Sequence, residues 1–168
     1  LQSRGLGDVY KRQFEENAVI KAKAVAGHPN AAGAVVLADD SGLEIDALNG
    51  EPGIYSARYL GEDTSYRIKN QNLIDRLEGV PDEKRTARFV CAIAAVFPGG
   101  ETVTTKGIIE GKIGYEERGT NGFGYDPIFY LPDMSRSTAE LLPEEKNAVS
   151  HRGNALREMK KELMLRFG

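Results

Sequence analysis

The sequence predicts an α/β fold in which a mixed, partly antiparallel sheet is flanked by helices. Three patterns support this prediction. An apolar stripe at helical spacing starts at Phe14, apolar runs of strand length occupy 34–38 and 86–97, and a second amphipathic stripe ends the chain at 150–167. Strand patterns that lie between helical patterns, with no internal repeat, indicate one α/β domain.

Composition narrows the class of protein. The 168 residues include 40% hydrophobic and 28% charged residues, which is ordinary for a globular domain. The net charge of −3 argues against a nucleic-acid partner held by a basic face. One cysteine excludes an internal disulfide framework and predicts a reducing, cytoplasmic setting. No apolar stretch approaches the ~20 residues of a membrane span, so no membrane partner is expected.

The first regular element is expected to begin at Phe14. Residues 1–13 show neither helical nor strand periodicity, and we interpret them as an artefactual segment that precedes a domain at 14–168. A helix then follows with one apolar stripe, and Gly27 and Pro29 end it. The stripe consists of Phe14, Ala18, Ala22, Val25 and Ala26.

Two short strands are expected next, at 34–38 and at Leu43–Ala47, joined by an Asp-Asp-Ser-Gly turn. The loop 49–53 leads to a polar, mostly helical segment from Asp63 to Glu78. These elements alternate as an α/β domain requires.

The second half of the sheet is predicted from a hairpin. The strand 86–97 is followed by Gly99-Gly100 and by a second strand at 101–113. The segment 119–127 is too rich in glycine for a regular element. Pro143 opens a short helix, and a last helix runs from Ser150 to Phe167 with an apolar face of Leu156, Met159, Leu163 and Phe167.

Paired carboxylates at the end of an apolar strand are the first candidate site. Asp39 and Asp40 follow Val35–Ala38, and in a strand their side chains would point to opposite faces. Carboxylate oxygens are the ligands that Mg²⁺ prefers, beside waters and substrate phosphates. A solvated turn explains the same residues equally well, because Asp, Ser and Gly all favour turns.

Glu16 is the second candidate. It lies opposite the apolar stripe of the first helix, where an exposed glutamate in the first turn is the simpler explanation. Asn17 and Lys21 are four residues apart on the flank of that helix. They form either a solvated pair or a pair directed at the same site as the carboxylates.

The glycine-rich loop 119–127 is the third candidate. Its glycines permit positive φ and a close approach of the backbone to a ligand. Phe123 has no obvious local packing partner, and a ring on a loop can stack on a base. A hairpin turn with Phe123 folded into the core is the alternative interpretation.

Basic residues at the start of the last helix form the fourth candidate. His151 and Arg152 follow Ser150, and positive charge there opposes the helix dipole unless an anion is bound. Lys146 on the preceding helix is expected to join them, and a solvated cluster paired with Glu144 or Glu145 is the alternative. Among single residues, Cys91 is expected in the core and His28 at the surface, whereas Arg58 contacts either phosphate or a carboxylate.

Five ordered blocks closely resemble the inosine/xanthosine triphosphate pyrophosphatase family. They are Phe14–Ala18 with Lys21-Ala22, Ala38–Leu43, Pro52–Tyr59, Gly122–Phe129 and Glu145–Gly153. The resemblance implies two lobes around a nucleotide cleft, and Mg²⁺-dependent hydrolysis of ITP, dITP and XTP to the monophosphate and pyrophosphate. It also implies a cytoplasmic homodimer.

The resemblance also implies roles for individual residues. Asp40 would activate water and bind metal, with Glu16 and Asp39 as further metal ligands. Ser41 would contact the purine nucleoside triphosphate. The nucleoside pocket would consist of Phe123, Gly124, Tyr125, Asp126, Lys146, His151 and Arg152.

One family feature has no counterpart in the sequence. The family begins with a strand and a Thr-Gly-Asn-x-x-Lys loop that grips the triphosphate, and residues 1–13 do not match it. The expectation is therefore an N-terminally truncated chain without the first strand. An inactive nucleotide-binding remnant and a pyrophosphatase of modified pyrimidine nucleotides are the alternatives. A haloacid-dehalogenase-type phosphatase is disfavoured, because its aspartates occur as Asp-x-Asp.

Overall fold

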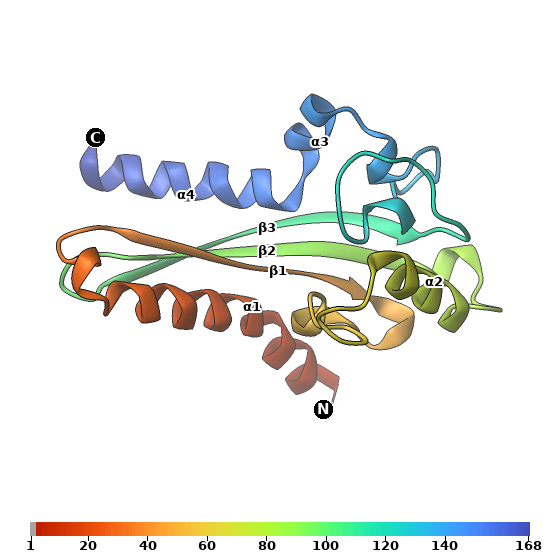
Figure 1. Ribbon diagram of the computed structural model, residues 1–168, viewed down its shortest axis with the longest axis horizontal. Helices are drawn as coiled ribbons and strands as arrows, with labels where there is room; N and C mark the ends of the chain where they lie inside the picture. Colours follow the sequence, from red (N-terminus) through yellow and green to blue (C-terminus); the bar gives the residue numbers. More distant parts are fainter. Residues whose placement is uncertain (1–2) are drawn as a thin grey trace. The chain divides into compact units, whose positions relative to one another are not determined.

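The computed structural model describes the backbone of residues 3–168 and the side chains from Arg12 onward. It confirms the α/β class, with four α-helices and four strands in the described residues (Figure 1). The helices and strands are α1 (Ser3–Ala26), β1 (Val36–Ile45), α2 (Tyr66–Arg76), β2 (Thr86–Val96), β3 (Thr102–Ile113), β4 (Phe129–Tyr130), α3 (Pro143–Val149) and α4 (His151–Phe167). No helix in this part of the chain has the length and apolar character to span a bilayer.

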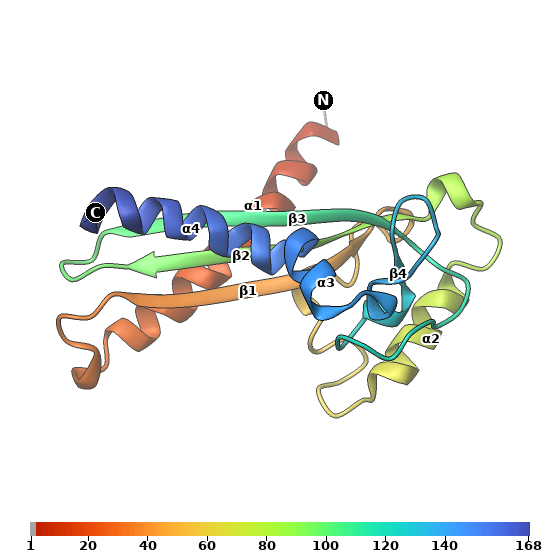
Figure 2. The same cartoon turned by 90° about the horizontal axis from the view of Figure 1, so that it is seen from above.

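The sheet has the strand order β1-β2-β3-β4. The arrowheads show that β2 runs opposite to β1 and β3 (Figures 1 and 2). β4 pairs antiparallel with β3, with Lys112 opposite Tyr130. The predicted hairpin between β2 and β3 is confirmed, and Gly99 and Gly100 both have positive φ, of 99° and 95°. These values suit glycine because it has no Cβ.

The chain divides into two compact units. Unit 1 comprises the residues up to Ser41, Val90–Gly107 and His151–Gly168. Figure 1 shows α1 and α4 on opposite faces of the strands in this unit. Its buried residues include Phe14, Ala18 and Ala22 of the predicted α1 stripe. A cluster that contains the predicted core residue Cys91 packs with Ile93, Ala95, Phe97, Ala155 and Met159.

A glycine allows α4 to lie directly on β3. A Cβ atom placed at Gly107 would lie 2.0 Å from the carbonyl oxygen of His151, so no side chain fits there. Thr105 also donates from Oγ1 to the carbonyl of Ala155 at 3.0 Å. The predicted apolar face of α4 is only partly buried: Met159 is 1% exposed, whereas Phe167 is 68% exposed. The close contact therefore involves the first half of the helix.

Unit 2 comprises Gly42–Phe89 and Ile108–Ser150. Its core joins α2 to the strands, with Leu43, Leu73 and Phe129 completely buried. Arg85 is also buried, and its guanidinium donates to the carbonyls of Leu77, Ile113 and Gly114, each at 2.8 Å. Burial lowers the pKa of Arg85, and the charge interactions with Tyr115 and Asp82 only partly oppose this shift. Three main-chain acceptors thus hold this side chain in place.

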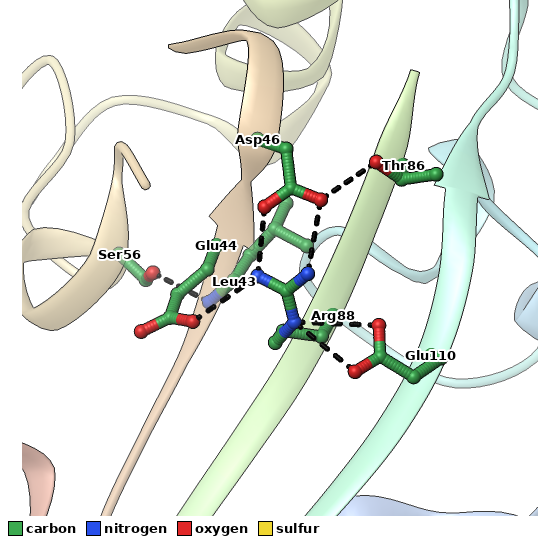
Figure 3. A network of polar contacts seen from close by, with 7 residues as sticks. All are labelled: Leu43, Glu44, Asp46, Ser56, Thr86, Arg88 and Glu110. Atoms are coloured by element: carbon green, nitrogen blue, oxygen red, sulfur yellow. Dashed lines mark hydrogen bonds and ion pairs between the residues drawn. The ribbon is translucent and has the colours of Figure 1, made fainter. Parts of the chain in front are cut away.

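A polar network lies across the strands of unit 2 (Figure 3). Arg88 of β2 donates from both terminal nitrogens to Asp46 at 2.9 Å, and from Nε to Glu110 of β3 at 3.2 Å. Thr86 donates to Asp46 at 2.6 Å. Two bonds to one carboxylate fix the geometry of the guanidinium more firmly than a single contact does.

Two predicted boundaries are wrong. The first helix begins at Ser3 rather than Phe14; once the Phe14 face is packed, each added residue gains a backbone hydrogen bond, so the helix extends. The predicted turn 39–42 lies inside the continuous strand β1. Pairing with β2 outweighs the turn preference of Asp, Ser and Gly there.

Two single-residue predictions also fail. Val25 is 55% exposed, so the packed stripe of α1 ends at Ala22. Ala47 belongs to a one-turn helix, Asp46–Leu48, rather than to a strand, and it is exposed. His28 is exposed as expected, and its ring accepts from the Asn30 amide at 3.2 Å.

Candidate functional site

Asp40 is held by two donors from α1 in unit 1. It is 9% exposed. Lys21 donates from Nζ to Oδ1 at 2.6 Å, and Asn17 donates from Nδ2 to Oδ2 at 3.3 Å. Asn17 and Lys21 are one helical turn apart, which puts both on the same face of α1. The second of the two alternatives for this pair is therefore correct, since both contact the carboxylate.

The two aspartates point to opposite faces of β1. Asp40 is buried, whereas the side chain of Asp39 is 47% exposed. Arg152 at the start of α4 donates to Asp39 Oδ2 at 3.1 Å, and Ser41 donates to the same oxygen at 3.4 Å. Lys21 also donates to the Asp39 carbonyl at 3.1 Å. The strand alternation predicted for this pair is confirmed, although the strand does not end there.

Cys91 lies close to this face of the sheet. Burial raises the pKa of its thiol, and hydrogen bonds with Ser41 and Arg152 oppose that shift. A neutral, buried thiol behaves as a small apolar residue. Cys91 therefore supports the Asp39 side of β1 as part of the core.

Glu16 and His151 complete the predicted residues of unit 1. Glu16 is exposed on α1 and lines a shallow surface hollow of about 400 Å³ with Arg12, Glu15, Val19 and Ile20. His151 is half-buried at the first position of α4. Among the described residues, no three His, Cys, Asp or Glu side chains are arranged to hold a metal ion. The predicted metal ligands Glu16, Asp39 and Asp40 therefore do not form a preformed three-ligand metal site.

The donor chemistry of Asp40 nevertheless fits a hard cation. Both of its oxygens face nitrogen donors, and one donor is an ammonium group at 2.6 Å. A carboxylate that attracts cationic and polar donors is the type of ligand that Mg²⁺ uses, and Mg²⁺ commonly needs only one or two such groups from a protein. Asp40 would hold the ion, whereas the Asp39 side chain points to the opposite face of β1 and pairs with Arg152.

Asp126 organises the glycine-rich loop in unit 2. Its side chain is buried, and Oδ2 accepts from the Phe123 amide at 2.9 Å and pairs with Lys146. Oδ1 accepts from Thr138 at 2.8 Å. Gly122 has φ +73°, and a Cβ there would lie 2.2 Å from Asp126 Oδ2. Glycine is therefore required at 122 for the carboxylate to fold under the loop.

The loop presents Phe123 to solvent and hides Tyr125. Phe123 is 68% exposed, and Lys146 Nζ lies 4.8 Å from its ring centroid. The alternative of a core position for Phe123 is thus wrong. Tyr125 is 5% exposed and donates to the Ser56 carbonyl at 2.5 Å, and burial raises the pKa of its hydroxyl. Tyr125 is a core residue, so any effect of its side chain on a nucleoside is through the loop backbone.

The structure separates the predicted residues into two groups. Unit 1 carries Glu16, Asp39, Asp40, Ser41, His151 and Arg152, and unit 2 carries Phe123, Gly124, Tyr125, Asp126 and Lys146. The sequence did not identify Thr138 and Asn70, which donate hydrogen bonds to Asp126 and to the Gly124 carbonyl of the loop. In a sequence, a threonine outside any predicted strand gives little indication that it contacts a functional loop. Arg58 is exposed, with its guanidinium 5.7 Å from the Tyr55 ring centroid.

The sequence is similar to those of known proteins over most of its length. The model of the Ham1 family matches residues 8–162. A protein of Exiguobacterium sibiricum named dITP/XTP pyrophosphatase is 51% identical over 155 residues, 92% of this chain and 77% of the relative. A dITP/XTP pyrophosphatase of Bacillus subtilis is 51% identical over 150 residues, which cover 89% and 74% of the two chains.

Solved structures give the same result. The Ham1 protein of Staphylococcus aureus superposes with a TM-score of 0.83 at 46% identity, over 91% of this chain and 77% of that chain. A HAM1 protein from Coxiella burnetii superposes with a TM-score of 0.82 at 46% identity, over 90% and 76%. On both sequence and fold, the chain belongs to the Ham1 family.

Proposed function

We propose that this protein hydrolyses non-standard purine nucleoside triphosphates, namely dITP, XTP and ITP, to the monophosphate and pyrophosphate, with Mg²⁺ as cofactor. The main support for the proposal is 51% sequence identity to proteins named dITP/XTP pyrophosphatase, over about nine-tenths of the chain. A buried, doubly held carboxylate at Asp40 supports it. Neither an inactive remnant nor a pyrimidine-directed enzyme is favoured by these relatives.

Asp40 is proposed as the group that accepts a proton from the attacking water. Its two oxygens differ, because Lys21 holds Oδ1 at 2.6 Å and Asn17 reaches Oδ2 only at 3.3 Å. Oδ2, which has the longer of the two hydrogen bonds, is proposed to receive the proton. Asn17 and Lys21 thus orient the base.

The cofactor would be held by Asp40 with Glu16 as a further oxygen ligand, and Asp39, on the opposite face of β1, would support the site from behind. When bound, Mg²⁺ supplies neutralisation of the charge that develops on the phosphates. Ser41 is proposed to contact the substrate beside these carboxylates. Arg152 already pairs with Asp39 Oδ2 at 3.1 Å, and with His151 it is proposed to supply donors to the nucleotide.

The base is proposed to stack on Phe123, which is 68% exposed on a loop held by Asp126. Lys146 lies beside that ring and can donate a hydrogen bond to an oxo group. Hypoxanthine and xanthine carry an acceptor at position 6, whereas adenine carries an amino donor. Donors placed at that edge would favour the oxo bases and leave adenine unpaired.

Further parts of the proposal rest on the resemblance to the pyrophosphatase family. The domain is taken as 14–168, the setting as cytoplasmic, and the assembly as a homodimer. Sedimentation velocity tests the assembly, since a dimer has twice the mass of the 18.4 kDa chain.

A substrate panel tests the function. The protein is incubated with Mg²⁺ and each of dITP, ITP, XTP, dATP, dGTP and a modified pyrimidine triphosphate, and pyrophosphate release is measured. Turnover of dITP, ITP and XTP well above that of dATP is the expected result. Equal turnover of all purines, or preference for the pyrimidine, would overturn the proposal, and D40N serves as the inactive control.

A further inference from the structure

Asn70 of α2 is a buried polar residue that joins two parts of the glycine-rich segment in unit 2. It is 1% exposed. Its Nδ2 donates to Glu117 Oε1 at 2.8 Å and to the Gly124 carbonyl at 3.3 Å. Glu117 stands before the loop and Gly124 inside it. One side-chain amide therefore connects both ends of the segment 117–124 to the helix.

The orientation of this amide is determined by its partners. A carboxylate and a carbonyl only accept hydrogen bonds, so the nitrogen of Asn70 must face them. Its Oδ1 is buried and has no hydrogen-bond partner among the described residues. An unmet buried acceptor disfavours folding, and an apolar side chain of similar size would avoid it. Asn70 is thus a poor choice for core packing alone, and its donors need another explanation.

Hydrogen bonds hold the first part of the loop, since Asn121 donates from its amide to the Ala139 carbonyl at 2.9 Å and from Nδ2 to the Leu141 carbonyl at 3.0 Å. Gly119, Gly122 and Gly124 have φ of 86°, 73° and 64°, in a region where glycine moves freely. Residues 119–123 are all exposed. Asp126 holds the Phe123 amide on one side of Gly124. On Gly124 itself, Asn70 supplies the hydrogen bond to the carbonyl.

We propose that Asn70 is a positioning residue for the nucleotide-binding loop 122–126, an inference that rests on the proposed function. By holding the Gly124 carbonyl, Asn70 fixes the Gly124–Tyr125 peptide, one residue after Phe123, and so keeps the ring oriented for stacking before nucleotide binds. Asn70 does not touch the substrate. Its contribution is preorganisation, which lowers the cost of ordering the loop on binding. It therefore affects KM more than kcat.

The test combines kinetics with hydrogen exchange on the full chain. N70A is compared with N72A, a matched control on the same helix whose Oδ1 accepts from Tyr59 at 2.6 Å. In N70A, KM for dITP should rise about three- to tenfold, as expected for one lost hydrogen bond. The kcat should change less than about twofold, and the amides of 117–126 should exchange faster. N72A should match wild type in both readouts.

Two variants reach the same contact from the exposed side, where misfolding is not expected. E117A removes one acceptor and should give a smaller rise in KM than N70A. E117Q retains an oxygen acceptor and should behave as wild type.

Asn70→Asp replaces the donors by a carboxylate opposite Glu117. Its KM should exceed that of N70A at pH 8 and fall toward it at pH 5, where a shared proton restores a donor.

The outcomes are separable. If N70A and E117A match N72A in KM and in exchange of 117–126, Asn70 does not position the loop and the inference is overturned. An equal loss of kcat and kcat/KM with unchanged exchange also overturns it. If wild type does not turn over dITP, the proposed function fails instead, whereas faster exchange in N70A alone would still show that Asn70 holds the loop.

Discussion

Lys21 of α1 donates to Oδ1 of Asp40 at 2.6 Å, and this ion pair sets the chemistry of the carboxylate in unit 1. The lysine side chain is 54% exposed and the aspartate side chain 11%. The charge partner is therefore accessible to solvent, whereas the carboxylate is protected. With Oδ1 held by the lysine, Oδ2 is the oxygen proposed for proton transfer.

The first prediction concerns Asp40. Asp40→Asn keeps the shape of the side chain but cannot accept the proton, so kcat for dITP should fall about 10²-fold or more. Pyrophosphate release under saturating dITP measures this. Asp46→Asn is the matched control, because Asp46 lies one residue after β1 in the Arg88 network. Near-normal turnover by D40N would remove Asp40 from the role of base.

The second prediction concerns Lys21. Lys21→Met removes the cation that competes for Asp40, so half-saturation by Mg²⁺ should occur at a lower concentration. The change should be about two- to fivefold, as befits a partly exposed pair, and kcat should fall because Asp40 is less well oriented. Mg²⁺ titration of activity measures both. Lys23→Met, an exposed lysine on the same helix, should change neither. A higher Mg²⁺ requirement in K21M would contradict the prediction.

The third prediction concerns Phe123. If the exposed ring stacks on the base, Phe123→Ala should raise KM for dITP at least about fivefold with kcat little changed. Leu142→Ala is the control, because Leu142 is also an exposed apolar residue of unit 2, at 57%. Steady-state kinetics distinguishes the two variants. An unaltered KM in F123A would mean that the base binds elsewhere.

The fourth prediction concerns stability and pH. Burial of Asp46 acts to raise its pKa, but the hydrogen bonds from Arg88 and Thr86 outweigh it and lower the pKa below the ordinary 3.8. Stabilisation by this carboxylate is thus present at neutral pH and is lost as the pH falls below 3.8, through the lowered pKa.

Urea unfolding of wild type and Asp46→Asn measures this contribution. Because the Asp46 side chain is 43% exposed, solvent screening limits the difference in free energy of unfolding to about 1 kcal/mol at pH 7. That difference should shrink at pH 2.5. A difference that stays constant between these pH values would show that the charge of Asp46 contributes nothing.

Much of the fold follows from the sequence, for identifiable reasons. The strand patterns at 86–97 and 101–113, with Gly99-Gly100 between them, predicted β2, β3 and their hairpin, because these patterns are local in sequence. The continuous strand through Asp39–Gly42 could not be predicted, since the partner strand that overrides the turn preference is about fifty residues away in the chain. The extension of α1 to Ser3 likewise depends on a helix already nucleated at its packed face.

The candidate site also contains residues that the sequence indicated and residues that only the structure reveals. Residue type and position made Asp39, Asp40 and Phe123 candidates, because paired carboxylates after an apolar strand can bind a metal and a ring on a loop can stack on a base. The family resemblance implied that Tyr125 lines the nucleoside pocket, and only the packed structure reveals it as a core residue. Thr138 and Asn70 act through tertiary hydrogen bonds to the loop, which no local pattern encodes.

Hydrolysis of dITP to the monophosphate and pyrophosphate is tested most directly by identifying the bond that is cleaved. Phosphorus NMR of dITP incubated with the protein and Mg²⁺ distinguishes pyrophosphate plus dIMP from orthophosphate plus dIDP. The wild-type protein should form pyrophosphate and dIMP in equal amounts, and D40N should form neither product at a comparable rate. Orthophosphate as the first product, or pyrophosphate formed equally fast by D40N, would contradict it.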